Sequence, residues 1–176
     1  MGLLKNRKFA VLICVVVVVL ATLIGVRGSL NRLARDVEAV FYDSFEGIDL
    51  HLNNRLNSAL GFASLMQKHP VLESEADALV LARRMLLDAK DIKDKFAANE
   101  SMQRAYVELS DRAGGLELSQ NEKGDIERYS STFFGAYAAI QNSPYNQRAQ
   151  SFMHDASFFA HLLKPFLFVK SPQLFA

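Results

Sequence analysis

Residues 45–62, FEGIDLHLNNRLNSALGF, carry two hydrophobic periods at once, and the fold class depends on which of them is real. Ile48, Leu50 and Leu52 alternate with polar residues, which is the pattern of a half-buried strand. Through a much longer region, apolar positions recur every three or four residues, as on one face of a helix. These positions are Leu33, Val37, Phe41, Phe45, Ile48, Leu52, Leu56 and Leu60. Because the alternation ends at Asn53, we predict a helix with this set as its buried face.

The next part of the chain predicts a second helix with a start signal of its own. We expect the first helix to end at His69-Pro70, because helical geometry is disfavoured for a residue that precedes proline. Ser74 and Asp77 have the spacing of an N-terminal cap, so the second helix is expected to begin at about Ser74. Its apolar face is expected to comprise Ala78, Leu81, Met85, Ala89, Ile92 and Phe96, widened by Leu79 and Leu86 and continued by Met102, Tyr106, Leu109 and Ala113.

A last long helix is predicted after a glycine pair. Gly114-Gly115 is a strong helix break, and Ser119 with Glu122 offers another cap directly after it. The helix is expected to bend or stop near Pro144. Its apolar face is expected to comprise Ile126, Tyr129, Phe133, Tyr137 and Ile140.

Together these helices predict an all-α fold, an antiparallel up-and-down bundle of three to four helices joined by short connections. The chain is rich in Leu and Ala and has only four Pro residues, and it lacks the regularly spaced short strands of an all-β domain. Gly47 and Gly61, in the first helix, are expected to let a neighbouring segment approach closely.

The N-terminal region predicts a transmembrane helix. From Phe9 to Val26 the sequence FAVLICVVVVVLATLIGV has no charged residue, and as a helix it would cover about 27 Å, roughly the thickness of a bilayer core. A cleaved signal peptide is the alternative, but the run is longer than a signal core and Gly25-Val26-Arg27 is a poor cleavage site. Basic residues flank the run equally on both sides, so the sequence leaves the orientation open.

Length and composition predict one domain behind this anchor. We divide the 176 residues into a short basic N-terminus (1–8), the anchor (9–26), a bundle (27–157) and an apolar tail (158–176). With 20 basic and 19 acidic residues, the chain has no electrostatic footprint for nucleic acid. Its single cysteine, Cys14, excludes an intrachain disulfide and a cysteine-built metal site.

The tail is unusually apolar for a segment that cannot span a bilayer. It contains Lys164 and Pro165 within the run FFAHLLKPFLFVKSPQLFA. In one interpretation it packs on the bundle, and in the other it binds the membrane interface or a partner. The residues that would make the second type of contact are Phe158, Phe159, Leu162, Leu163, Phe166 and Phe168.

The polar residues of the opening stretch are the candidate partner surface. Asp49, Asn53, Asn54 and Arg55 are either a hydrated helix face with one interhelical hydrogen bond or a docking surface that presents donors to a partner. We expect no catalytic, cofactor-binding or metal site, because the chain has no Gly-rich phosphate loop, Gly-x-Ser-x-Gly elbow or His-Glu-x-x-His motif. His51 and His69 are also eighteen residues apart, which is not metal-ligand spacing.

Three segments resemble the LemA family. The run FEGIDLHLNNRLNSALGFASLMQKH, residues 45–69, resembles its Ile-Asp-x-x-Leu signature, and SPYNQRAQSF, residues 143–152, resembles its Tyr-Asn segment. Residues 158–175 resemble its apolar tail. The resemblance implies a membrane-anchored helical bundle of bacteria, without an established enzymatic activity, in a cell membrane or a membrane derived from it.

These expectations favour a structural, scaffolding or protein-interaction module at a membrane. Residues 9–26 would contact lipid, the partner would be a protein, and self-association is open. The alternative is a ligand-responsive sensor or accessory subunit, which would have a pocket between its helices. An enzyme is the third and least favoured hypothesis.

Overall fold

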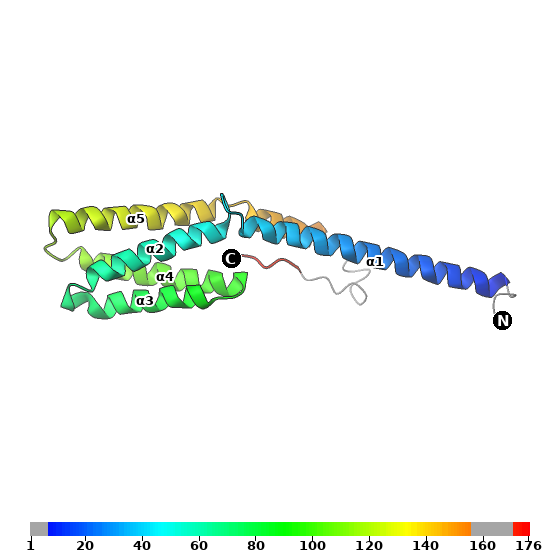
Figure 1. Cartoon of the computed structure of the whole chain (residues 1–176), viewed down its shortest axis with the longest axis horizontal. Coiled ribbons are helices and arrows are strands. Elements are labelled where there is room, and N and C mark those ends of the chain that lie inside the picture. Colours follow the sequence, from blue (N-terminus) through cyan, green and yellow to red (C-terminus); the bar gives the residue numbers. More distant parts are fainter. Residues whose placement is uncertain (1–6, 156–170) are drawn as a thin grey trace. The chain divides into compact units, whose positions relative to one another are not determined.

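The computed structural model describes residues 7–155 and 171–176, and within these ranges the chain is helical without strands (Figure 1). The predicted all-α fold is therefore confirmed. Residues 145–155 form a further helical segment. The labelled elements are α1 (Arg7–Phe41), α2 (Ile48–Met66), the 3₁₀ helix η2 (Pro70–Leu72), α3 (Glu73–Asp88), α4 (Ile92–Ala113) and α5 (Gln120–Gln141).

The chain forms two compact units. One unit comprises residues 1–38 and 148–172, and the other comprises residues 39–147 and 173–176. Helix α1 continues without a break from the apolar run into the predicted bundle range 27–157, as far as Phe41. The residues proposed as a partner-binding tail, from Phe158 to Phe168, lie outside the described ranges.

The bundle belongs to the second unit and consists of α2 to α5. Helix α2 packs against both α3 and α5, and α3 packs against α4 (Figure 1). Three aromatic rings join α2, α4 and α5 at the centre: the Tyr106 ring stacks on Phe133 with centroids 3.9 Å apart and lies 4.7 Å from Phe62. All three side chains are fully buried. The antiparallel arrangement follows from the short connections between successive helices.

The predicted continuous apolar face from Leu33 to Leu60 is wrong, because the helix breaks after Phe41. Asp43 Oδ1 accepts hydrogen bonds from the backbone N–H groups of Phe45 (2.8 Å) and Glu46 (3.0 Å), which replaces helical bonding with a turn. These two bonds also lower the pKa of Asp43. Phe45, a member of the predicted face, is 84% exposed in this turn.

The prediction that a glycine allows close approach of a neighbouring segment is confirmed for Gly61, whereas Gly47 lies against its own turn. A Cβ atom at Gly61 would overlap the ring of Tyr129, and one at Gly47 would overlap backbone atoms of Phe41 and Asp43. Gly47 also donates its N–H to the Asp43 carbonyl (3.1 Å), so the turn closes against its own backbone. The first contact joins α2 to α5, and the second permits the turn that precedes α2.

The centre of the predicted core face of α3 is also wrong, whereas its flanking residues Leu79 and Leu86 are buried as predicted. Leu81 and Met85 are 62% and 52% exposed. The buried side chains are Ala76, Leu79, Ala82 and Leu86. Ser74 is not the cap, because η2 brings the helix start forward to Glu73. Helix α3 has more apolar residues than one helix face can hold. Hydrophobic periodicity alone therefore does not decide which of them face the core.

One helix was expected from Ser74 to Ala113, but the chain reverses at residues 89–91. Asp91 caps α4 by accepting the N–H of Asp94 at 2.9 Å. The apolar spacing continues across this turn because α3 and α4 each need an apolar face. The Asp-x-x-Asp spacing was the available signal for a new helix start.

The predicted cap of α5 is confirmed as a reciprocal capping box. The Glu122 N–H donates to Ser119 Oγ (3.3 Å), and the Ser119 N–H donates to Glu122 Oε2 (2.9 Å). Glu122 also pairs with His69 Nε2 at 3.0 Å. The hydrogen bonds from Ser119, with a smaller contribution from His69, lower the pKa of Glu122 to about 2.

This cap predicts an acid-sensitive contribution to stability. A carboxyl group whose pKa is lower in the folded state stabilises the fold fully above its unfolded pKa, about 4.5, and loses that effect as the pH falls towards about 2. Glu122→Gln keeps the hydrogen-bond acceptor and removes the charge. We expect the variant to be less stable than the wild type at pH 7, with a gap that closes between pH 4.5 and 2. Thermal unfolding followed by circular dichroism measures this gap, and a gap independent of pH would contradict the assignment.

Candidate functional site

The four polar residues of α2 that were predicted as a candidate partner surface do not lie on one exposed face. Asn53 is exposed, Asp49 and Asn54 are half-buried, and Arg55 is fully buried. Successive helix residues are separated by about 100°, so Asn53 to Arg55 sweep across more than half the helix circumference. Arg55 therefore presents no donor to an external partner in this structure, and that part of the prediction is corrected.

Arg55 instead connects three helices inside the bundle. Its Nη1 and Nη2 donate to the side-chain oxygens of Asn99 and Gln103, both on α4. Its guanidinium carbon lies 4.1 Å from the ring centroid of Phe133 and 5.1 Å from that of Tyr137, both on α5. A planar guanidinium suits this arrangement, because it can stack on aromatic rings while its edges donate hydrogen bonds.

Burial changes the acid–base balance of Arg55 without removing its charge at neutral pH. Desolvation lowers the pKa of Arg55 to about 10, and the nearby Glu100 acts in the opposite direction. Its hydrogen-bond partners Asn99 and Gln103 are neutral amides rather than carboxylates. The arrangement can orient α4 and α5 on α2, and buried polar groups of this kind favour one packing register over others.

Asp49 is engaged within the bundle as well. It forms an ion pair with Lys95 of α4. The Lys95 ammonium also lies 5.1 Å from the centroid of Tyr42 and 5.5 Å from that of Phe41. Asp49 and Lys95 border a small pocket of about 130 Å³ between α2, α3 and α4, to which Asn53 and Leu87 also contribute.

Residues 173–176 pack on the end of the bundle, as the first interpretation of the apolar tail predicted for residues 158–176, but the residues that receive them were not predicted. Tyr145 donates its hydroxyl to the carbonyl of Gln173 (2.6 Å). Asn146 contacts Phe175 twice: its Nδ2 donates to the Phe175 carbonyl (2.7 Å), and its Oδ1 accepts the Phe175 N–H (2.9 Å). From α4, the Lys93 N–H donates to Gln173 Oε1 at 3.2 Å.

The ring of Phe175 fills an aromatic pocket at the same place. It is 4% exposed and lies 5.3 Å from Phe96 and 5.7 Å from Phe41, measured between ring centroids. Tyr145, itself fully buried, packs edge-on against Phe41 at 5.3 Å. The sequence signals for this site were the apolar tail itself and the SPYNQRAQSF segment, which contains Tyr145 and Asn146.

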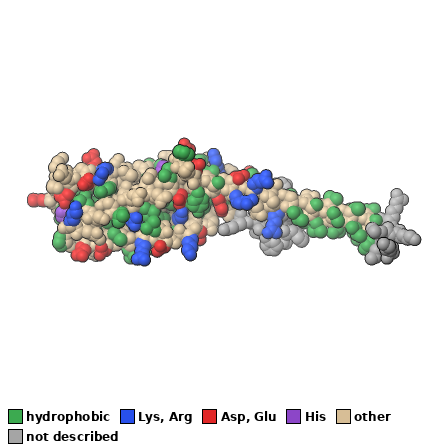
Figure 2. All heavy atoms as spheres, viewed as in Figure 1, with side chains coloured by type: hydrophobic (Ala, Val, Ile, Leu, Met, Phe, Trp, Pro, Cys, Tyr) green, Lys and Arg blue, Asp and Glu red, His purple; other side chains and the backbone are tan. Residues whose placement is uncertain are grey.

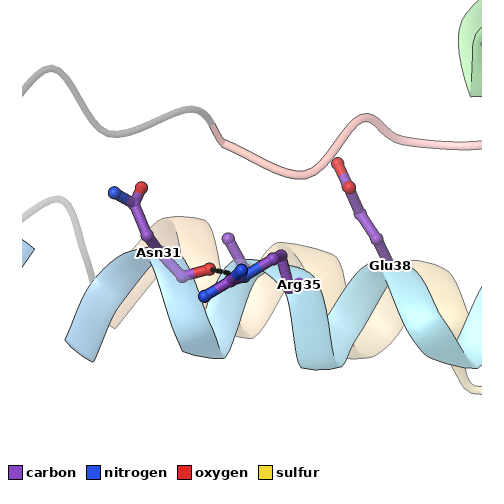
Figure 3. Close-up of a pocket in the computed structure, with 4 residues that line it drawn as sticks. Asn31, Arg35 and Glu38 are labelled. Carbon is purple, nitrogen blue, oxygen red and sulfur yellow. Dashed lines mark hydrogen bonds between the residues drawn. The ribbon is translucent and has the colours of Figure 1, made fainter. Parts of the chain in front are cut away.

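A second hollow lies on α1. Asn31, Ala34, Arg35 and Glu38 line a pocket of about 320 Å³ (Figure 3). Arg35 Nε donates to the Asn31 carbonyl (3.3 Å), so its guanidinium follows the helix surface. The lining residues all come from one helix within the described chain, and this provides no convergent set of functional groups.

Two histidines in the described part of the chain have a carboxylate neighbour. His69 belongs to the α5 cap, and His154 contacts the neighbouring Asp155 at 3.4 Å. Within residues 7–155 and 171–176, no group of three or more His, Cys, Asp or Glu side chains could hold a metal ion.

One helix in the described ranges, Phe9–Phe41, is long and apolar enough to cross a membrane by length and composition. A signal sequence would satisfy the same criteria. Comparisons of the chain with protein-family models, curated proteins and solved structures gave no match. The resemblance to the LemA family therefore stays a prediction.

Proposed function

We propose that this protein is a single-pass, membrane-anchored helical bundle that acts as a protein-interaction or scaffolding module, with the LemA-like layout that its sequence resembles. The observation that carries the proposal is the apolar part of α1. Its large side chains from Phe9 to Leu20 are exposed, and hydrophobic side chains gather along this segment in Figure 2. A continuous apolar surface of this size is unfavourable in water and is stabilised by a lipid bilayer.

The bundle supports a binding role over a catalytic one. The groups that could perform chemistry are used to hold helices together: Arg55 joins α4 and α5 to α2, Asp49 pairs with Lys95, and Glu122 caps α5. The interhelical pocket beside Asp49 is about 130 Å³, which is smaller than the usual few hundred Å³ of small-molecule sites. The sensor hypothesis therefore receives less support than the interaction module.

The proposal predicts that membrane attachment depends on the middle of the apolar run. Replacing Val16 and Val18 with Arg introduces two charges, each of which opposes insertion by about 2.5–3.5 kcal/mol at a helix centre. We expect the wild type to remain in the membrane pellet after an alkaline carbonate wash and the double variant to appear in the supernatant. Val16→Leu with Val18→Leu is the matched control and should behave as the wild type. An intact mass showing that residues 9–26 have been removed would refute the anchor.

The interaction role is tested by crosslinking in intact membranes. A photoreactive residue at exposed Asn53 should capture a defined protein, and the same residue at exposed Leu81 samples a different surface of the bundle as a control. Identification of the captured species by mass spectrometry gives the result. Capture of lipid alone from both positions would contradict an interaction module.

A further inference from the structure

The contacts made by residues 173–176 are those of a bound peptide. Residues 171–176 have no helical or strand bonding of their own, and their hydrogen bonds go to side chains or to the start of α4. Two of the acceptors are main-chain carbonyls, at Gln173 and Phe175. The bundle therefore recognises this segment through its backbone as well as through one large side chain.

Asn146 performs the backbone recognition. A side-chain amide has two N–H donors and an acceptor oxygen, and one donor lies on the same side as the oxygen. The group can therefore pair with the N–H and C=O of a single extended residue. Asn146 makes both bonds with Phe175, at 2.7 and 2.9 Å. Such pairing resembles the addition of a strand to a sheet edge and is insensitive to the side chain of the bound residue.

The aromatic pocket supplies the side-chain selectivity. Phe41, at the end of α1, and Phe96, at the start of α4, contact the Phe175 ring. Tyr145, at the start of the 145–155 helix, packs against Phe41 and binds the Gln173 carbonyl. A buried aromatic ring in a pocket of aromatic partners is the usual anchor of a peptide or protein interface. In contrast, Ala176 after it is exposed.

We propose that Asn146, Tyr145, Phe41 and Phe96 form a recognition site for an extended peptide carrying one aromatic side chain. Residues 173–176 of the same chain occupy this site in cis. In the alternative, trans arrangement, the same segment of a second copy takes their place. A second copy carries the identical ligand, and exchange replaces each contact by an equivalent one, which is why swapping between copies costs little. The trans arrangement rests on the proposed function, because a shared membrane raises the local concentration of copies. The peptide site itself does not depend on that function.

Peptide binding is tested with the full chain in detergent micelles. The probe is a fluorescent peptide of residues 171–176, SPQLFA, followed by anisotropy. Phe175→Ala empties the aromatic pocket, so we expect this variant to bind the probe at least about tenfold more tightly than the wild type, whose own segment competes. Adding Asn146→Ala should weaken binding about tenfold, since two hydrogen bonds are lost. Asn121→Ala, which changes an exposed Asn of α5 that belongs to neither proposed surface, is the matched control.

The outcomes separate the parts of the proposal. Equal binding by Phe175→Ala and the wild type, or unchanged binding after Asn146→Ala, overturns the peptide site. A probe with Ala in place of its Phe should not bind, and binding would refute the aromatic selectivity. Phe175→Leu keeps an apolar side chain in the pocket and replaces Phe175→Ala if that variant does not fold. We expect Phe175→Leu to bind the probe with an affinity between those of the wild type and Phe175→Ala. An affinity equal to that of the wild type overturns the site.

The second-copy occupant is tested by complementation in one membrane. A chain with Asn146→Ala retains its segment but has a damaged site, and a chain with Phe175→Ala has the reverse defect. When the two are coexpressed with different tags, one intact contact can form only in trans, so they should copurify severalfold more than either variant with itself. Equal copurification overturns the exchange between copies while peptide binding stands on its own measurement. Neither result depends on the carbonate wash that tests the anchor.

Discussion

Arg55→Ala is expected to lower the free energy of unfolding by about 3–5 kcal/mol. The substitution removes a fully buried side chain from between α2, α4 and α5 and leaves a cavity beside Phe133. It also leaves the oxygens of Asn99 and Gln103 without their donors, and an unsatisfied buried acceptor costs about 1–3 kcal/mol. Urea unfolding of the full chain in detergent micelles, followed by tyrosine near-ultraviolet circular dichroism, measures the change.

Arg55→Met separates packing from hydrogen bonding. Methionine fills much of the same volume and removes a charge whose burial is costly, as the lowered pKa of Arg55 shows. We therefore expect a loss smaller than that of Arg55→Ala, about 1–3 kcal/mol, arising from the orphaned amides. If Arg55→Ala were as stable as the wild type, Arg55 would lie at the surface, and its use as a partner contact would have to be reconsidered.

Gly47→Ala is expected to destabilise the fold by about 1–3 kcal/mol, because the added methyl group has no space. Its Cβ would overlap backbone atoms of Asp43 and Phe41, and backbone cannot move aside as a side-chain end can. The φ of −69° at Gly47 is accessible to alanine, so the cost comes from the contact rather than from backbone strain. Thermal and urea unfolding of the same preparation provide the comparison.

Gly124→Ala is the matched control for this prediction. Nothing lies within 4 Å of a Cβ atom at Gly124, which is inside α5. Alanine is a better helix former there, and we expect a gain of about 0.5–1 kcal/mol. Opposite signs for the two substitutions would support the close turn before α2. If the two substitutions changed the stability equally, the effect at Gly47 would come from its conformational freedom alone and not from the close contact.

The candidate sites differ in how much of them the sequence reveals. The anchor is readable because a bilayer requires one uninterrupted run, and Phe9 to Val26 supplies it within a single helix. Arg55 was assigned to a polar face because its neighbours Asn53 and Asn54 are polar. A second clue was available, since Arg55 shares its side of α2 with Ala59 and Phe62, both fully buried. Helix α2 is buried on two sides, against α3 and α5, so its core includes a row that the first apolar face omits.

The peptide site was beyond the reach of local patterns. Phe41, Phe96, Tyr145 and Phe175 are far apart in the chain, and each is an ordinary aromatic residue in its own segment. Their meeting depends on where α1 ends and where α4 begins. Both boundaries were missed, at the Asp43 turn and at the Asp91 cap.

Local physical chemistry was sufficient for the helical class, the apolar run, the Ser119 cap and the breaks at His69-Pro70 and Gly114-Gly115. Each of these depends on residues within one or two helical turns of each other. Tertiary packing selected the buried rows of α3, placed Arg55 between Asn99 and Phe133, and brought Phe175 to Asn146. These choices depend on partners that are distant in the sequence. An apolar or polar row has the same local pattern whether it faces another helix or the solvent.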